Sequence, residues 1–426
     1  MFTIKDFGIK IKRSTLLNGS SVLLFQKKGM PIYTEIRLAS GSRFDPPGKE
    51  GLAHFVEHML VAGSKKFPSK DTMAIYIEQL GGVFGASVGP DSIGIAVEVA
   101  GKEDYSKSVL LLREMLTESL FDDKVIKTER KSIFREIGDK ISNPSKYIWD
   151  LHAELFYQDT EVGKSNLGSK DSVRSISRKN LYTHYQNMIV SGRATTVVCG
   201  DIELEQVVKE LETNLPLRIS KKYNFGEILP VTRNKHILIY QYPNQEQVHM
   251  LIGFRTSGIK NHKTIPLSIL STIFGKGRAS VLKKRLRYEK GLVYGAQTYT
   301  MNLSDAGTWT VKTSTSKEKL QEVMDIITEE FSRIASGGIT DEELQFAKNK
   351  MTRSSRRQMQ TAASWVKRHI RRELAGNSML LPEYLNAIND VGKEDISQVG
   401  KEYFKPNSWY LAMCGDVDEA SVKVNF

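Results

Sequence analysis

The amino-acid sequence predicts an α+β fold of two homologous α/β-roll domains, each a mostly antiparallel sheet with helices packed on one face. One observation is that short apolar segments typical of strands, such as residues 22–26 and 32–39, alternate with longer helical patterns, such as 124–140 and 172–186. The other is that several short segments of the first half return in the second half at a nearly constant spacing. The chain is therefore predicted to contain one structural unit twice.

The repeat is clearest around the two cysteines. Cys199 and Cys414 each lie in an apolar run that ends in Gly-Asp, which indicates a buried strand followed by a turn. Two further pairs of segments recur in the same order along the chain. The three pairs are 196–202 with 411–417 (offset 215), 38–42 with 255–259 (offset 217), and 121–123 with 339–341 (offset 218).

The boundary between the halves is expected where turn-forming residues gather and periodicity is lost. Pro216, Gly226 and Pro230 lie in such a segment. We therefore predict a first domain at 1–215, a linker at 216–235 and a second domain at 236–426.

The length and composition are typical of a globular protein that crosses no membrane. The chain has 426 residues, of which 40% are hydrophobic and 26% are charged. No apolar run approaches the roughly 20 residues that span a bilayer, and the charges in the first six residues are unlike a signal peptide. We therefore expect no membrane association and a cytoplasmic location.

Charge and cysteine content argue against two further classes of protein. The net charge is +12, but the basic residues are spread along the whole chain, and the densest run, 283–287, fits the exposed face of a helix. Nucleic-acid binding is therefore not expected. Two cysteines are too few for a disulfide framework or a thiolate zinc site, so buried free thiols are expected.

Residues 51–60 are predicted to form a buried amphipathic helix, because their apolar residues recur at helical spacing. On that helix His54, Glu57 and His58 fall within roughly 100° of arc. Two imidazoles one turn apart can hold one zinc ion, and a carboxylate beside them can take a proton from a water that the metal activates. The alternative, two core histidines and a capping glutamate, leaves buried polar groups in need of partners. The order His-x-x-Glu-His is typical of the inverzincin group of zinc peptidases.

A third metal ligand is expected elsewhere, since catalytic zinc sites usually have three protein ligands. Glu129 and Glu136 are seven residues apart in a helical segment and lie within about 20° of each other around its axis. One of them can ligate zinc while the other orients a ligand or the attacking water. A solvated helix face is the alternative explanation. In the second half Ala347 and Ser354 stand at the corresponding positions, and the counterpart of the zinc helix, 266–272, has no histidine, so one half alone is expected to hold metal.

Together these residues resemble the M16 metallopeptidases, the pitrilysin or insulinase-like family. In that family the inverted zinc motif is completed by a downstream Glu-x6-Glu helix whose second glutamate binds zinc. The resemblance implies that His54, His58 and Glu136 hold one Zn²⁺ ion per chain, that Glu57 is the catalytic base and that Glu129 is a supporting carboxylate. It covers nearly the whole chain and matches the small bacterial two-domain type.

A second family signature lies in the other half. Residues 280–294 resemble the family segment S-R-L-x5-R-x3-G-L-x-Y, although Val281 replaces the basic residue after the serine. The family's Arg and Tyr line the substrate cleft, which implies catalytic and substrate-binding roles for Arg287 and Tyr294. A cation for a substrate carbonyl or carboxylate and a phenol near a developing oxyanion fit these roles. Without the resemblance, the segment reads as a helix that ends at Gly291 and a strand tyrosine.

The resemblance also implies a strand that receives the substrate. The family commonly has an Asn-Ala pair there, and this chain has Gly85 and Ala86, followed by Ser87 and Val88. With Gly85 in place of the asparagine, one side-chain contact to the peptide is lost. The exposed backbone can still pair with an extended peptide as an added strand.

The sequence therefore predicts a zinc metalloendopeptidase or oligopeptidase that hydrolyses peptides or unfolded segments in an enclosed chamber. In the family two chains face each other around the peptide, and the Arg/Tyr pair reaches the zinc from the opposite chain. A homodimer is accordingly expected, with a heterodimer containing an inactive homologue as the alternative. Two other functions stay open: a processing peptidase for a leader or maturation peptide, and a non-catalytic structural subunit of a larger assembly. The intact His-x-x-Glu-His motif argues against the last.

Overall fold

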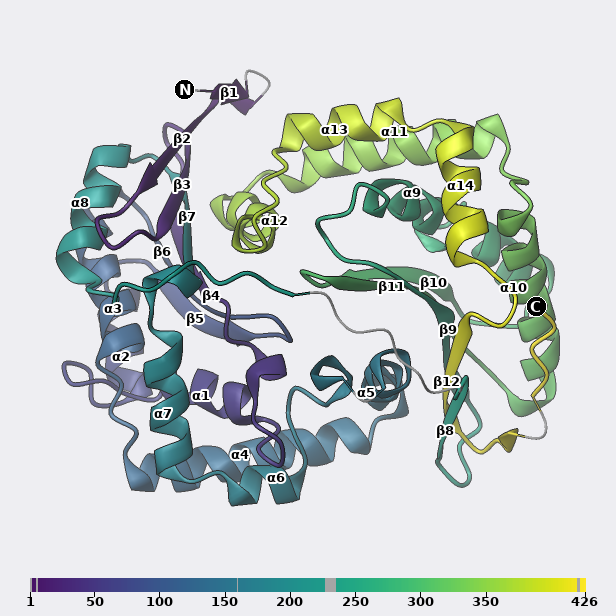
Figure 1. Cartoon of the computed structure of the whole chain (residues 1–426), viewed down its shortest axis with the longest axis horizontal. Helices are drawn as coiled ribbons and strands as arrows, with labels where there is room; N and C mark the ends of the chain where they lie inside the picture. Colours follow the sequence, from purple (N-terminus) through teal and green to yellow (C-terminus); the bar gives the residue numbers. More distant parts are fainter. Residues whose placement is uncertain (1, 5–6, 159, 227–234, 420–421) are drawn as a thin grey trace. The chain divides into compact units, whose positions relative to one another are not determined.

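The structure, a computed structural model, describes residues 2–4, 7–158, 160–226, 235–419 and 422–426 (Figure 1). It divides into two compact units, each composed of three segments of the chain. Residues 227–234 of the predicted linker lie outside the described residues, and the predicted domain boundaries stay a prediction. Unit 1 comprises Met1–Ile137, Ser165–Phe225 and Arg357–Leu380, and unit 2 comprises Gly138–Lys164, Gly226–Arg356 and Leu381–Phe426.

Unit 1 contains a seven-stranded sheet in which neighbouring strands are antiparallel, except for the parallel pair β3 and β7. Strand β7 is buried at every residue, as expected for the centre of a sheet that is covered on both faces. At one end of the sheet lies β5. In spatial order the strands are β1 (Phe2–Ile4), β2 (Ile9–Thr15), β3 (Ser21–Gln26), β7 (Ala194–Gly200), β4 (Ile32–Leu38), β6 (Ile93–Val99) and β5 (Val83–Val88).

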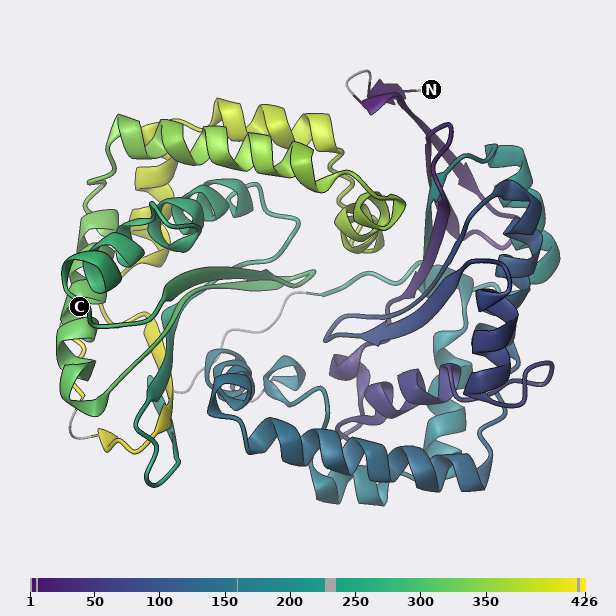
Figure 2. The same ribbon diagram turned by 180° about the vertical axis from the view of Figure 1, so that it is seen from behind.

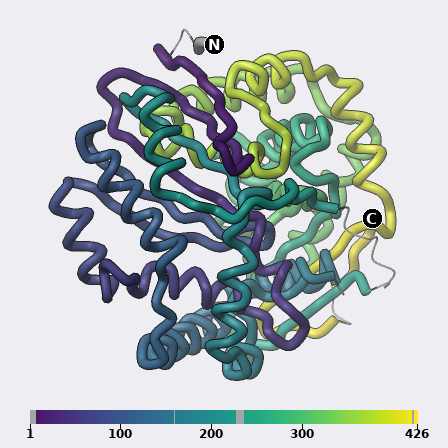
Figure 3. The backbone as a smooth tube through the Cα atoms, turned by 60° about the vertical axis from the view of Figure 1, so that its left-hand side comes forward, coloured from purple at the N-terminus to yellow at the C-terminus, as the bar shows by residue number. Residues whose placement is uncertain are grey.

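Helices cover both faces of this sheet. In Figure 1, α3 and α8 lie on one face and α12 lies on the other, where it contacts β7 and β4. Figure 3 follows the backbone with the side of α3 and α8 turned forward. The helices of unit 1 are α1 (Leu52–Leu60), α2 (Lys70–Glu78), α3 (Tyr105–Thr117), most of α4 (Asp123–Ile141), α6 (Lys170–Ser175), α7 (Arg178–Met188), α8 (Leu204–Asn214) and α12 (Ala362–Leu374).

Unit 2 contains a five-stranded sheet with one parallel pair, β12 and β8. Helices α9 and α14 contact one face, and α5 contacts β12 and β9 on the other (Figures 1 and 2). In spatial order the strands are β10 (Ala296–Asn302), β11 (Ala306–Thr315), β9 (Val248–Ser257), β12 (Trp409–Gly415) and β8 (Ile237–Gln241). The helices are α5 (Pro144–Tyr157), α9 (Thr264–Gly275), α10 (Leu320–Ala335), most of α11 (Asp341–Gln358), α13 (Leu381–Asp390), α14 (Lys393–Tyr403) and a π-helical segment, Lys283–Glu289.

The two sheets repeat one topology, which confirms the predicted α+β fold of two homologous domains, although helices contact both faces of each sheet and not one face alone. The order β3-β7-β4-β6-β5 of unit 1 returns as β8-β12-β9-β11-β10 in unit 2. Each pair of neighbours has the same sense in both sheets, including the single parallel pair. Cys199 and Cys414 lie on the corresponding strands β7 and β12, and both are free and buried, as predicted.

Each sheet also carries, on its second face, a helix from the opposite half of the chain. On the sheet of unit 1 this helix is α12, whose Trp365 is fully buried and packs against Phe25 of β3 with ring centroids 5.5 Å apart. On the sheet of unit 2 it is α5, whose Leu151 and Phe156 share a buried cluster with Leu251 of β9. Because both faces of each sheet are apolar, both faces need a cover. The two halves supply these covers reciprocally.

One predicted helix is wrong in its continuity. The pattern over 172–186 predicts a single helix, but the structure has α6 and α7, which are separated at Ile176 and Ser177. Ser177 caps α7 by accepting a hydrogen bond from the backbone N–H of Asn180, and this cap starts a new helix. Among the described residues, none of the helices combines the length and apolarity needed to cross a bilayer.

Candidate metal centre

Helix α1, which carries the His-x-x-Glu-His motif, is fixed at its N-terminal end by Gly51 and Asp45. Gly51 has a φ of 90°, which favours glycine, and a Cβ there would lie 2.4 Å from the carbonyl oxygen of Leu167. The buried Asp45 carboxylate accepts hydrogen bonds from the backbone N–H groups of Gly51 (2.9 Å) and Ala53 (2.8 Å). Burial raises the pKa of Asp45 to about 7, against the lowering effect of these hydrogen bonds.

The two imidazoles of α1 face each other. His54 Nε2 and His58 Nε2 are 3.3 Å apart, and the two ring planes lie at 79°. Glu57 lies beside them, and one ligand atom from each of the three side chains falls within 4.8 Å of the others. The apolar residues of α1 are buried in the core of unit 1. The core therefore holds the helix in the rotation that groups its polar side chains.

Two carboxylates from α4 complete the cluster. Glu136 places Oε2 3.5 Å from His54 Nε2 and Oε1 3.6 Å from His58 Nε2. Glu129, two turns earlier on α4, places Oε2 2.8 Å from His58 Nδ1. The structure thus brings together all five residues that the sequence assigned to this site, with Glu136 beside the facing nitrogens and Glu129 behind the His58 ring.

These distances fit a tetrahedral zinc site. Two ligand atoms at about 2.0–2.1 Å from one zinc ion and at the tetrahedral angle lie about 3.3–3.4 Å apart. The two Nε2 atoms are 3.3 Å apart, at that value, and each lies near one oxygen of the Glu136 carboxylate, His54 at 3.5 Å from Oε2 and His58 at 3.6 Å from Oε1. When His58 donates its Nδ1–H to Glu129, its Nε2 lone pair is directed at the point that the other donors share. Two imidazoles and one carboxylate are also the donor set of one class of catalytic zinc site.

Burial and neighbouring charges shift the pKa values in the cluster. Burial raises the pKa of Glu57, which suits a carboxylate that accepts a proton near neutral pH. Burial by itself lowers the pKa of His58, but the hydrogen bond to Glu129 and the charges of Glu57 and Glu136 outweigh it, so that this pKa is raised. The same hydrogen bond lowers the pKa of Glu129.

The residues expected to bind substrate in unit 1 lie on β5. Gly85 is paired with Ala96 of β6 and Ala86 with Ile95, in the antiparallel register that continues through Ser87 and Val88. Within the described residues no strand pairs with the other edge of β5, and β5 contacts α1. A Cβ added at Gly85 would meet no atom within 4 Å. The free edge and the open glycine leave room for an added strand.

Arg287 and Tyr294, seven residues apart in the sequence, both belong to unit 2. Arg287 lies in the π-helical segment Lys283–Glu289, with its guanidinium 5.7 Å from the ring centroid of Tyr288. Arg285 anchors this segment by donating to Glu330 of α10 at 2.6 Å. Tyr294 is 82% exposed, so its phenol is available for an external partner.

Two further residues position this site and were not predicted from the sequence. Asp45, described above, holds the start of α1. Arg130 of α4 lies over the ring of Phe55 on α1, 5.2 Å from its centroid, and donates to the carbonyl oxygen of Ile176 at 2.9 Å. One sequence feature could have indicated the role of Asp45, namely that it is an acidic residue in a Pro-rich turn just before a helix. No sequence feature indicates the role of Arg130, because its partners Phe55 and Ile176 come from distant parts of the chain.

Comparison with known families identifies the class of protein that this fold and site define. The family model described as Insulinase (Peptidase family M16) matches residues 33–170, which include the whole metal cluster. The model described as Peptidase M16 inactive domain matches residues 175–351. The chain belongs to peptidase family M16.

Its relatives include proteins named as zinc proteases. It is 26% identical over 410 residues to an uncharacterized zinc protease of Rickettsia bellii, covering 93% of this chain and 95% of that protein. It is 24% identical over 396 residues to the uncharacterized zinc protease YmxG of Bacillus subtilis, covering 92% and 96%. The human mitochondrial-processing peptidase subunit alpha is 24% identical over 438 residues, covering 96% of this chain and 82% of that subunit.

Solved structures show the same fold. A protease from Helicobacter pylori superimposes with a TM-score of 0.86 at 19% identity, covering 95% of this chain and 99% of that one. A Pseudomonas fluorescens protein described as a peptidase M16 inactive domain superimposes with a TM-score of 0.87 at 17% identity, covering 96% and 99%. The duplicated α+β architecture is thus shared across these chains.

Proposed function

We propose that this protein is a zinc-dependent peptidase that hydrolyses peptide bonds in peptides or unfolded segments enclosed in a chamber. The observation that carries the proposal is the convergence of His54 Nε2, His58 Nε2 and the Glu136 carboxylate at 3.3–3.6 Å from one another. Two imidazole nitrogens and one carboxylate at this spacing suit one zinc ion per chain with a fourth position open, and this supports the proposal. The zinc-protease names of the relatives support the same chemistry.

Each residue of the cluster has a distinct task. A bound zinc ion supplies Lewis acidity, which polarises a carbonyl oxygen and lowers the pKa of water toward 7. The Glu57 carboxylate takes the proton of the attacking water and delivers it to the nitrogen of the leaving amine. Glu129 accepts the Nδ1–H of His58 and so fixes the tautomer and orientation of that ring.

The substrate is held as an additional strand on β5. Its backbone pairs with the free edge at Gly85, Ala86, Ser87 and Val88, which places an extended peptide beside α1. Main-chain pairing recognises extended backbone and depends little on side chains. This mode of binding suits peptides and unfolded segments more than folded proteins.

Arg287 and Tyr294 complete the site in a dimer. The exposed Tyr294 phenol donates a hydrogen bond to the developing oxyanion, and the Arg287 cation binds a carbonyl or carboxylate of the substrate. In a homodimer each chain contributes the metal cluster to one site and this pair to the other. The protein acts in the cytoplasm.

A specialised processing peptidase is the second candidate, and the similarity to a mitochondrial-processing peptidase subunit favours it. It uses the same cluster and differs from the first candidate in cutting one leader or maturation peptide. A non-catalytic subunit is the third possibility. It is disfavoured because all the cluster's residues and their spacing are retained.

Metal analysis and peptide hydrolysis on the same preparation test these proposals. We expect about one zinc per chain, many peptides cut, and activity that is lost on chelation and restored by added zinc. Glu57→Gln is expected to retain zinc and to lose hydrolysis by about 10²–10⁴-fold, because the base is removed. Glu78→Gln on α2, an exposed position outside the cluster, is the matched control. Zinc-loaded protein that cuts nothing would identify a structural subunit, and a single cut in one precursor would identify a processing peptidase.

A further inference from the structure

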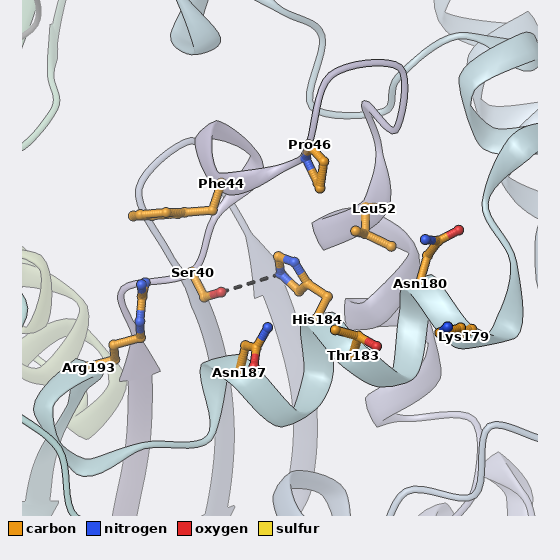
Figure 4. Close-up of a pocket in the computed structure, with 10 residues that line it drawn as sticks. All are labelled: Ser40, Phe44, Pro46, Leu52, Lys179, Asn180, Thr183, His184, Asn187 and Arg193. Carbon is orange, nitrogen blue, oxygen red and sulfur yellow. Dashed lines mark hydrogen bonds between the residues drawn. The ribbon is translucent and has the colours of Figure 1, made fainter.

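Unit 1 contains a cavity of about 540 Å³ beside the N-terminal end of α1 (Figure 4). Its walls are the loop that carries Ser40 and Phe44, the first residue of α1, one face of α7, and Arg193, which directly precedes β7. None of the metal-cluster residues lines it. Its volume falls within the range of about 300–1,000 Å³ that is usual for small-molecule sites.

The charges that line this cavity are all positive. Lys179 and Arg193 contribute two cations, and no Asp or Glu is among the lining residues. Neither cation forms an ion pair with a carboxylate in the described part of the chain. Arg193 instead lies 4.9 Å from the ring centroid of Phe44 and 4.4 Å from that of Tyr223, and it donates to the carbonyl oxygen of Ala39.

Arg193 is a half-buried cation, and among the residues that the structure describes its side chain contacts two π-faces and a carbonyl oxygen. Burial lowers the pKa of Arg193, as expected for a charge removed from water without a neighbouring carboxylate. In Figure 4, Arg193 and Lys179 lie at opposite sides of the lining residues, with His184 between them. An anion in the cavity would offset charge that the protein leaves uncompensated.

The floor of the cavity is polar and uncharged. His184 of α7 is buried, and its Nε2 lies 3.3 Å from Ser40 Oγ, the contact drawn in Figure 4. Burial lowers the pKa of His184 to about 4, so the ring is neutral at physiological pH and can exchange hydrogen bonds without adding a charge. Thr183 and Asn187, four residues apart on α7, add a hydroxyl and an amide at the exposed rim.

Apolar side chains form the remaining wall. Phe44, Pro46 and Leu52 line the side of the cavity next to α1. A site with two cations, neutral hydrogen-bonding groups and an apolar wall suits a molecule that has an anionic group and an apolar body.

We propose that this cavity binds a small organic anion, namely a carboxylate or a phosphate carried on an apolar ring or chain. The anionic group lies between the two cations, beside the His184 ring, and the apolar body lies against Phe44 and Leu52. Since Leu52 is the first residue of α1, an occupant contacts the helix that carries the metal cluster without contacting the cluster itself.

Calorimetric titration of the full chain with matched probes tests the proposal. The probes are 3-phenylpropionate, phenyl phosphate and the neutral 3-phenylpropanamide. We expect at least one anion to bind at least about tenfold more tightly than the amide, and binding to weaken as salt is added. The two anions distinguish a carboxylate site from a phosphate site. Binding should shift the NMR signals of the His184 ring, which places the ligand in this cavity.

Two pairs of variants locate the effect. Asn187→Asp adds a carboxylate at the rim, and we expect it to weaken anion binding by about tenfold or more. Gln186→Asp adds the same charge to the same turn of α7 outside the lining residues and should leave binding within about twofold. Lys179→Gln, at an exposed position, should weaken binding several-fold, whereas Lys170→Gln on α6 should not. Circular dichroism and thermal unfolding confirm that each variant is folded.

The proposal is overturned by any of three results: neither anion binds at up to about 10 mM, the amide binds as well as the anions, or Asn187→Asp and Gln186→Asp behave alike. All three readouts are independent of peptide hydrolysis. They therefore stand whether or not the proposed activity is found.

Discussion

At the scale of single residues, the Glu129 carboxylate orients the His58 imidazole toward the proposed metal position. The hydrogen bond between Glu129 Oε2 and His58 Nδ1, 2.8 Å long, aligns the imidazole with its Nε2 toward His54 and Glu136. A neutral amide in place of the carboxylate is a weaker acceptor, so the ring is held less firmly and its metal-binding nitrogen becomes less basic.

We therefore predict that Glu129→Gln weakens zinc affinity by about 10–100-fold while leaving the fold intact. Competition with a chromophoric chelator measures this affinity. Asp139→Asn, an exposed carboxylate change on the same helix, is the control and should leave affinity unchanged. Equal zinc affinity in Glu129→Gln and the wild type would show that Glu129 does not support the ligand.

Asp45 gives a second prediction, on stability and pH. Its folded pKa of about 7 lies above the value of about 4 in an unfolded chain, so the folded state holds the proton to higher pH. The contribution of this group to the free energy of unfolding is therefore greatest below pH 4. It falls as the pH rises to about 7, by up to roughly 4 kcal/mol.

Asp45→Asn removes this titration, so the comparison isolates it. We expect the unfolding free energy of the wild type, minus that of Asp45→Asn, to decrease between pH 4 and 7, with both proteins metal-free. Urea unfolding at several pH values measures the difference. A difference that grows over this range would mean that the backbone hydrogen bonds from Gly51 and Ala53 outweigh the cost of burial.

The residues that could be predicted from the sequence are those whose meaning depends on local spacing. His54, Glu57 and His58 lie within about one turn of α1. Glu129 and Glu136 are seven residues apart, so both carboxylates lie on the same side of the second helix, α4. The role of Asp45 could not be predicted from local spacing, because it depends on a turn that brings the carboxylate back to the backbone N–H groups at the start of α1.

At the scale of elements, β5 is the edge strand that faces the proposed substrate. Gly85 leaves a gap in its side-chain row, and a Cβ there meets no atom within 4 Å. A larger residue at this position is therefore tolerated by the fold. It can also reach a peptide that is paired with the free edge.

We predict that Gly85→Asn lowers the KM for peptide substrates several-fold, because the amide adds a hydrogen bond to the bound strand, and that it changes stability by less than about 1 kcal/mol. Steady-state kinetics on one peptide series measures the effect. Gly89→Asn, at a second open glycine just beyond β5, is the control. An unchanged KM in Gly85→Asn would place the substrate elsewhere.

Helices and strands were predicted correctly where the local apolar pattern determines them. They were predicted less well where a capping residue or tertiary packing determines their bounds or position. The helix α1 and the strand β7 agree with their apolar patterns. The break between α6 and α7 depends on the cap at Ser177, which helical periodicity does not reveal. The positions of α5 and α12 were not predicted, because an amphipathic pattern shows that a helix has an apolar face and not which sheet it covers.

At the scale of the whole molecule, the metal cluster belongs to unit 1 and the Arg287–Tyr294 pair to unit 2. The proposed dimer joins the cluster of one chain to the pair of the other. Mixing two inactive variants distinguishes this arrangement from a site within one chain, since each variant lacks a different half of the machinery.

We predict that Glu57→Gln and Tyr294→Phe chains, mixed in equal amounts and allowed to exchange, regain about one quarter of wild-type activity. Half of the resulting dimers are mixed, and each mixed dimer has one complete site. Hydrolysis of a quenched fluorescent peptide follows the recovery. A chain carrying both substitutions, mixed with either single variant, should give none. Activity no higher than that of the separate variants would exclude sites shared between chains.

The reciprocal cover of the two sheets has a consequence for synthesis on the ribosome. Strands β3, β4 and β7 are complete by residue 200, yet α12, which covers one of their faces, begins only at residue 362. Until that late helix emerges, the growing chain exposes an uncovered apolar surface to solvent. A message truncated before codon 362 would therefore yield an aggregation-prone, protease-sensitive fragment and not a stably folded first unit. This holds even though every proposed metal ligand would already have been translated.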